Sequence, residues 1–351
     1  MITQIDTKLL KICTEIFNLK FINPINQKQE KEKFFSLKNY NPQFKTLPLN
    51  NNLENYKSYL ENIPLNNSPI ETILKNKAKK LISWINMLQN IGKPDFTKYS
   101  IEYYNLPFEN LIKKSKDLIK TKTTLEPLEI SSKELTIILN KELKKYPNWK
   151  SMEKPNLGSR IDDVTLEKTI YVKEGEKFSK NDIKRLIVHE INTHTKRTVN
   201  GEKQKYKFFT YGTANYEETE EGLAVYMEEK HKVINPQTLK NYAGRVLAIH
   251  LALENSFRDT FNYLKKYFSE ETAYHLTLRA KRGLSDTSKP GAFTKDLIYL
   301  KGYEKIKTHL NNNPEDLNKL FIGKIAIEDL NYINSLKSGP LYNFLKSCKN
   351  K

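Results

Sequence analysis

The sequence predicts an α+β protein that is mainly helical, with a small β-sheet edge and a helical C-terminal half. Three observations lead to this fold class. Apolar residues recur at helical spacing along most of the chain, alternation typical of strands is confined to residues 149–172, and no internal repeat or long linker divides the 351 residues. A chain of this length with 38% apolar residues can bury one large core or two small ones.

The first 125 residues are expected to form an N-terminal helical region packed on the core. Residues 1–40 predict an amphipathic helix followed by a Lys- and Glu-rich connector, and residues 41–67 predict irregular chain. Ser68 can cap a second helix and Pro69 suits its first turn. The apolar positions of that helix keep helical spacing: Ile70, Ile73, Leu74, Ala78, Leu81 and Ile82.

Residues 126–351 are expected to form the second region. It follows a predicted helix over 108–120 and begins with one over 131–145. The segment IDDVTLEKTIYV alternates and carries β-branched residues, and its polar turn at Glu167-Lys168 predicts a hairpin or sheet edge. Ser179, with Asp182 three residues on, predicts the start of a helix that closes at Asn200-Gly201. Further helices are predicted over 216–233, 237–266, 269–281, 294–310 and 326–336.

The balance of charge is strongly basic, with 59 Lys plus Arg against 41 Asp plus Glu and a formal net charge of +18. Such a balance favours anionic partners: nucleic acid, acidic lipid headgroups or acidic peptides. The charge is spread along the chain, and no zinc finger, RRM-type aromatic motif or Gly-rich RNA-binding loop accompanies it. We therefore expect a solvated basic surface and no specific nucleic-acid binding. These features do not predict the oligomeric state.

Two cysteines, Cys13 and Cys348, lie near opposite ends of the chain. This placement fits neither a disulfide framework nor a C-x-x-C metal site, which favours a reducing compartment. Residues 1–17 mix acidic residues into an amphipathic pattern, unlike a signal peptide. No 18 apolar residues run together. The sequence thus predicts a cytoplasmic protein without a membrane span.

The motif HEINTH carries the most chemistry, because it places Glu190 between the imidazoles of His189 and His194. A catalytic zinc needs three protein ligands and one open position, and imidazoles with a carboxylate are a common set. Histidines five residues apart, however, lie about 140° apart around a regular α-helix. A π-type bulge would bring them onto one side, and such bulges often occur at functional sites. We therefore expect a widened turn here.

A third ligand is expected from a following helix, where an acidic cluster precedes Gly222. Spacing alone does not choose among its members, since both Glu220 and Glu221 can point inward. The same cluster would also suit a helix N-terminus, whose macrodipole favours acidic residues. The candidates are Glu217, Glu218, Glu220 and Glu221.

The motif HEINTH, the later TEEGLAVYMEE and the distal block RAKRGLSDTSKPGAFTKDLIYLKG together resemble the tyrosine carboxypeptidase-like metallopeptidase family. The resemblance covers roughly residues 130–335. It implies a zincin-like catalytic core with an H-E-x-x-x-H helix, bound Zn²⁺, and a zinc metallopeptidase region over residues 126–351. Carried onto matching positions, it makes His189, His194 and Glu221 the metal ligands and Glu190 the general base.

The chain departs from the commoner family wording at two positions. Asn192 stands where Gly is frequent, and Glu220 stands where Gln is frequent. Neither change removes a proposed ligand, and Glu220 adds a charge beside the site that is expected to bear on specificity.

The reaction that the resemblance implies is hydrolysis of the C-terminal bond of a peptide or protein tail, with release of tyrosine or another aromatic residue, and the basic surface would suit an acidic tail. Two alternatives remain open: a zinc amidohydrolase acting on a non-peptide amide, and a non-catalytic metal-binding regulatory protein. A carboxypeptidase must hold the terminal carboxylate of its substrate, and Lys295 and Arg282 are the candidates in the distal block. Arg197 and Arg245 are alternatives. Candidates for stabilising the oxyanion are Tyr211 and Tyr299.

Overall fold

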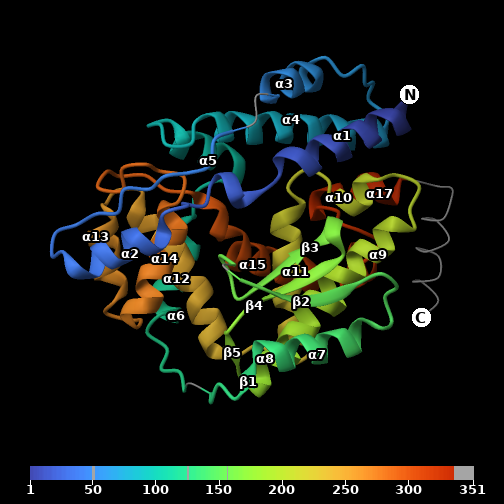
Figure 1. Ribbon diagram of the computed structural model, residues 1–351. Helices are drawn as coiled ribbons and strands as arrows, with labels where there is room; N and C mark the ends of the chain where they lie inside the picture. Colours follow the sequence, from blue (N-terminus) through green and yellow to red (C-terminus); the bar gives the residue numbers. More distant parts are fainter. Residues whose placement is uncertain (50–51, 125, 156, 336–351) are drawn as a thin grey trace.

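The computed structural model describes residues 1–49, 52–124, 126–155 and 157–335. It is mainly helical with two small sheets, so the predicted α+β class is confirmed. In Figure 1 the N-terminal helices α1, α3 and α4 lie across one side of the molecule, and the strands lie beside the central helices. The zincin-like core and the boundary at residues 125 and 126 remain predictions.

The N-terminal region contains more helix than its sequence pattern predicts. Helix α1 and the capped helix α4 are confirmed, and the Ser68 side chain accepts the Glu71 N–H at the start of α4. The predicted connector and irregular chain are wrong in part, since they contain α2 and α3; both helices pack through few apolar residues, which hides their periodicity. The helices of this region are α1 Ile2–Ile16, α2 Gln27–Ser36, α3 Leu53–Glu61, α4 Pro69–Gln89, α5 Phe96–Tyr104 and α6 Glu109–Leu118.

A three-stranded sheet follows, in the order β2-β4-β3. Strand β3 pairs with β4 antiparallel and Lys168 between them adopts a left-handed conformation, which confirms the predicted turn. Strand β2 pairs with β4 in parallel. The elements are β1 Ile130–Ser131, α7 Ser132–Leu143, β2 Lys150–Lys154, β3 Ile161–Val164, β4 Thr169–Lys173 and β5 Lys177–Phe178, with β1 and β5 forming a separate two-stranded sheet.

The centre of the molecule is a continuous helical rod followed by α11. Ser179 and Asp182 form the predicted capping box at its start. The rod then widens into a π-helix before it returns to α-helix. Its segments and the next two helices are α8 Lys180–Leu186, η3 Ile187–Thr195, α9 Lys196–Glu202, α10 Phe208–Tyr211 and α11 Tyr216–Lys230.

The C-terminal half is helical, as predicted, but the expected long helix over 237–266 is broken in two. Ser256 caps the second piece, and the buried Lys281 ammonium donates to the carbonyls of Ala252 and Asn255 at the break. A side chain distant in sequence thus donates to carbonyls that have no partner within the helix at its C-terminal end, and local periodicity does not reveal such a contact. The elements are α12 Pro236–Ala252, α13 Phe257–Leu264, α14 Glu270–Lys281, α15 Leu297–Asn312, α16 Asp316–Leu320 and α17 Leu330–Asn334, with short turns η1 Leu19–Phe21, η2 Thr165–Glu167, η4 Thr294–Asp296 and η5 Ile327–Asp329.

Two packing contacts position the candidate site. Ile191 of the π-helix is fully buried in a small core with α7 residues and with Ile170 of the sheet. Helix α11 meets α15 at Gly222 and Gly302, where a methyl group added to either glycine would overlap the backbone of the opposite helix. The π-helix and α11 are therefore held from opposite sides.

Cys13 is buried and free, whereas Cys348 lies outside the described residues. Among the helices of the described residues, none combines the length and the apolar character needed to cross a membrane.

Candidate metal centre

The two histidines of HEINTH lie on the π-helix η3, so the predicted widened turn is confirmed. It extends over nine residues, and the Thr193 hydroxyl donates to the carbonyl of Val188, five positions earlier, at 2.9 Å. The imidazole rings of His189 and His194 lie 4.8 Å apart, inclined at 81°. The wider turn therefore brings both rings to one side of the rod, as a regular α-helix would not.

Glu221 of α11 faces both imidazoles. Its Oε2 lies 3.5 Å from His189 Nε2 and 3.8 Å from His194 Nε2. Ligand atoms about 2.1 Å from a tetrahedral zinc are separated from one another by about 3.4 Å. One ligand atom from each of His189, Glu190 and His194 also lies within 4.8 Å of the others. The donors present fit a zinc ion, with Glu221 at ligand spacing and Glu190 as a second carboxylate beside the imidazoles.

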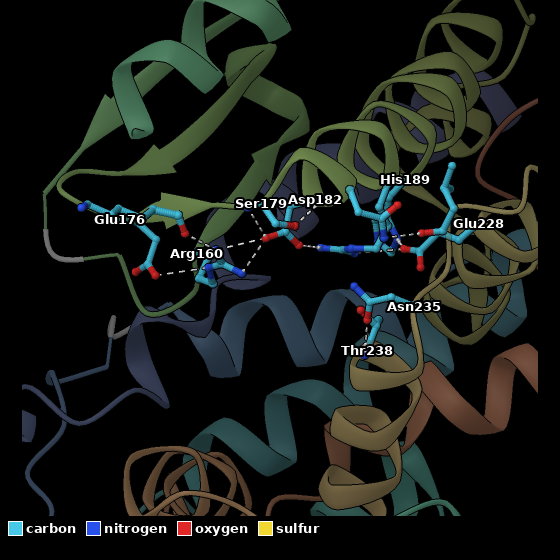
Figure 2. A network of polar contacts seen from close by, with 12 residues as sticks. Arg160, Glu176, Ser179, Asp182, His189, Glu228, Asn235 and Thr238 are labelled. Atoms are coloured by element: carbon cyan, nitrogen blue, oxygen red, sulfur yellow. Dashed lines mark hydrogen bonds and ion pairs between the residues drawn. The ribbon is translucent and has the colours of Figure 1, made fainter. Parts of the chain in front are cut away.

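His189 is supported from behind by Glu228. The Glu228 carboxylate lies 2.6 Å from His189 Nδ1 and 3.0 Å from Arg185 Nη1. Because a carboxylate only accepts hydrogen bonds, Nδ1 carries a proton toward Glu228, and Nε2 is the ring nitrogen that faces Glu221. Figure 2 shows this row of contacts continuing away from His189 toward Asp182, Arg160 and Glu176.

His194 has the same kind of support on its other side. Its Nδ1 lies 2.8 Å from Glu220 Oε1, and Arg197 donates to the other oxygen of Glu220. Arg197 is fully buried and also donates to the carbonyls of Leu320, Gly323 and Ile325. Each histidine therefore contacts a glutamate of α11 through Nδ1, and an arginine of the helical rod contacts the same glutamate. The pairs behind His189 and His194 are Glu228 with Arg185 and Glu220 with Arg197.

The charges around the cluster favour a cation at its centre. Burial opposes ionisation of Glu220 and Glu221, but Arg197 and Lys324 lower the pKa of Glu220 to about 2, and the two imidazoles lower that of Glu221 to about 2. Burial would lower the pKa of His189, yet Glu190, Glu221 and Glu228 raise it well above its usual value. Ionised carboxylates therefore surround the two imidazoles.

The four substrate-binding candidates lie in different surroundings. Lys295 Nζ is 3.8 Å from Glu217 Oε1, one turn before Glu221 on α11, and Tyr299 follows on α15. Arg282 is 7% exposed and donates to Asn23 and Asp296. The hydroxyl of Tyr211 donates to Asp6 of α1 at 2.8 Å. The structure thus brings Lys295 to the cluster, while Arg282 and Tyr211 are engaged elsewhere; their substrate roles remain predictions.

The two departures from the family wording are both accommodated. The Asn192 amide oxygen accepts a hydrogen bond from Lys145 at 3.1 Å, so this side chain faces the turn that follows α7. Glu220 is 5% exposed and bonded to His194 and Arg197, so its charge acts on a histidine.

Sequence reasoning missed Glu228 and Arg185. Glu228 follows Glu221 by seven residues, which places both on one face of α11, and Arg185 precedes His189 by one helical turn. These spacings were the available signal. The spacing of Glu228 carried little weight because α11 contains six glutamates, and spacing alone does not relate Arg185 to a glutamate of another helix.

The fold and the cluster define a mainly helical α+β protein with a candidate single-metal centre on a π-helix. The family model for "Microtubule-associated tyrosine carboxypeptidase" matches residues 32–343, and the chain belongs to this family. It is similar to microtubule-associated tyrosine carboxypeptidase 1 of mouse (35% identity over 152 residues, 41% of this chain and 32% of the relative) and of human (34% over 155 residues, 42% and 32%). It is also similar to the human putative tyrosine carboxypeptidase MATCAP2 (31% over 160 residues, 43% and 29%).

The match covers about a third of the length of these curated relatives.

Proposed function

We propose that this chain is a zinc-dependent metallopeptidase with a zincin-like core, and that it removes the C-terminal residue of a peptide. The observation that carries the proposal is the position of Glu221 Oε2, 3.5 Å and 3.8 Å from the Nε2 atoms of His189 and His194. The oriented Nδ1 contacts of both imidazoles support it, because carboxylate-bonded histidines are typical of zinc sites.

Residues His189, His194 and Glu221 would hold the ion. A zinc ion bound there would lower the pKa of a water molecule toward ~7 and polarise the substrate carbonyl. Glu190 lies beside both imidazoles, where its carboxylate accepts the proton of the attacking water and returns it to the leaving amine nitrogen. Glu190 is 9% exposed, and partial removal of a carboxylate from water strengthens its charge interactions.

The substrate that we propose is the C-terminal tail of a peptide or protein, acidic in character, with tyrosine as the released residue. The net charge of +18 suits an acidic chain, and the family model and relatives carry tyrosine carboxypeptidase in their names. A cytoplasmic location remains a prediction.

Two measurements test the proposal. Elemental analysis of the purified protein is expected to find about one zinc per chain. Incubation with a peptide library, followed by mass spectrometry of the peptide ends, is expected to show loss of single C-terminal residues by the wild type.

The variant Glu190→Gln separates metal binding from turnover. It is expected to retain zinc and lose cleavage, whereas the control Glu229→Gln, on the exposed part of α11, keeps both. Zinc-loaded wild-type protein that cleaves no peptide would sink the proposal.

A further inference from the structure

A group of cationic side chains lies next to Glu221 on the side of α15. Lys295 is 3.8 Å from Glu217, which precedes Glu221 by one turn of α11, and its Nζ is 6.0 Å from the centre of the Tyr299 ring. The guanidinium of Arg245, from α12, lies 4.2 Å from the same ring. Tyr299 therefore connects Arg245 to the residues beside the candidate metal centre.

Tyr242 connects Tyr299 to the residues that support His189. Tyr242 stacks on Tyr299 with ring centres 5.2 Å apart. Burial raises the pKa of Tyr242 well above its usual value, Glu228 raises it further, and Arg185 and Arg245 oppose the shift. The ring of Tyr242 lies 5.0 Å from the guanidinium of Arg245, and its phenol is close enough to Glu228 and Arg185 for their charges to act on it.

The cations of this group differ in whether a carboxylate pairs with them. Asp296 accepts hydrogen bonds from Arg279 and Arg282, and Lys295 faces Glu217. Arg245 adds a further positive charge near Asp296. Asp296 and Glu217 pair with Arg279, Arg282 and Lys295, and Glu221 also lies within electrostatic reach of Lys295 and Arg279. Among the described residues no carboxylate forms an ion pair with Arg245, and a partly buried cation of this kind favours an anion from outside the chain.

Arg245 has the free hydrogen-bonding capacity. Its Nη1 is buried and has no hydrogen-bond partner among the described residues. Arg197 donates to carbonyls and to Glu220. Arg282 also has a buried Nε without a partner among the described residues, but its two terminal nitrogens donate to Asn23 and Asp296. A guanidinium can bind a carboxylate with two parallel hydrogen bonds, and a buried donor without an acceptor is costly.

We propose that Arg245, held over Tyr299 and flanked by Lys295, binds the terminal carboxylate of the substrate. This inference rests on the proposed function. One residue of chain spans at most about 3.6 Å, so the carboxylate of a C-terminal residue must bind close to the ion that acts on its peptide bond. Tyr299 and Lys295 link Arg245 to Glu217, one turn before Glu221, on the side of the candidate metal centre.

The test compares one tyrosine-terminated hexapeptide as free acid and as C-terminal amide. Binding to zinc-loaded Glu190→Gln protein is measured by calorimetry, so that cleavage does not interfere. The acid is expected to bind about 10- to 100-fold more tightly than the amide, the range for a charge-assisted hydrogen-bonded pair. Adding Arg245→Gln should remove this preference and leave the affinity for the amide unchanged.

Two further variants sharpen the comparison. Arg245→Lys keeps the positive charge but cannot form two parallel hydrogen bonds, so it should retain part of the preference for the acid. Lys240→Gln removes a charge from the same helix, where Lys240 donates to the carbonyl of Thr121, and should retain all of it. Thermal melts check that each variant folds.

The carboxylate assignment would be overturned if folded protein with Arg245→Gln still prefers the acid as strongly as the Glu190→Gln protein does. It would also be overturned if the Glu190→Gln protein binds acid and amide equally. Either result leaves the proposed function intact where wild-type protein cleaves the acid. Preference for the acid without wild-type cleavage would overturn the proposed function and keep the carboxylate site. Failure of both binding and cleavage would overturn both.

Discussion

Arg197 and Glu220 form a buried ion pair directly behind His194, with the guanidinium on one carboxylate oxygen and His194 Nδ1 on the other. Removing the charge of Glu220 should weaken metal binding, because hydrogen-bonded carboxylates orient histidine ligands and raise their basicity. We expect Glu220→Gln to raise the zinc dissociation constant about 10-fold. Competition with a chelator measures it.

The matched control for Glu220→Gln is Glu229→Gln, because Glu229 lies on the same helix and pairs with the surface residue Lys307. Unchanged affinity in folded Glu220→Gln protein would show that Glu220 does not support the metal site.

Removing the metal should lower the thermal midpoint of the wild-type protein. An ion that binds only the folded state stabilises it by about 2.7 kcal/mol at a free concentration 100 times its dissociation constant. We expect His194→Ala to abolish the response to chelator and zinc. His309→Asn should retain it, since His309 pairs with Asp316 on α16. A full response in folded His194→Ala protein would contradict the ligand assignment.

Gly222→Ala should destabilise the fold and displace Glu221. The added methyl would overlap the backbone of Gly302, and overpacking of this kind typically costs about 1–3 kcal/mol. Denaturant unfolding and chelator competition report the two effects. Gly158→Ala is the control, because its methyl would meet only the Asn23 amide at 3.7 Å. Equal stability of the two variants would refute a close crossing of α11 and α15.

Asp329 should make stability depend on pH in a mildly acidic range. Burial raises its pKa from 3.8 to about 6, so the folded protein holds a proton that the unfolded chain releases. Its contribution is full below pH 3.8 and is lost as the pH rises through about 6, for a total of about 3 kcal/mol. Relative to Asp329→Asn, the free energy of unfolding of the wild type should fall over this range. Parallel pH profiles for the two proteins would disprove the shift.

Much of the candidate site could be predicted from the sequence because its signals are local. Five-residue spacing of two histidines that must share one ion requires a widened turn, and the structure has a π-helix there. The capping residues Ser179 and Asp182 likewise predicted the start of the helical rod. Glu220 and Glu221 could not be separated by periodicity, and only the family resemblance chose between them.

The parts that could not be predicted depend on contacts distant in sequence. The break between α12 and α13 is stabilised by Lys281, and the roles of Glu220 and Glu228 follow from the packing of α11 against the rod. Arg245 was one of several basic candidates, and only its place on the Tyr299 ring and its free Nη1 set it apart.

The contact between Gly222 and Gly302 has a dynamic consequence. Glu221 precedes one of these glycines and Tyr299 lies three residues before the other, so the proposed metal ligand and the ring beside the proposed carboxylate site are joined through adjacent main chains. No flexible side chain intervenes to absorb a relative shift. Thermal motions of α11 and α15 should therefore be correlated, and the spacing between these two groups should stay constant while the strands across from them fluctuate independently.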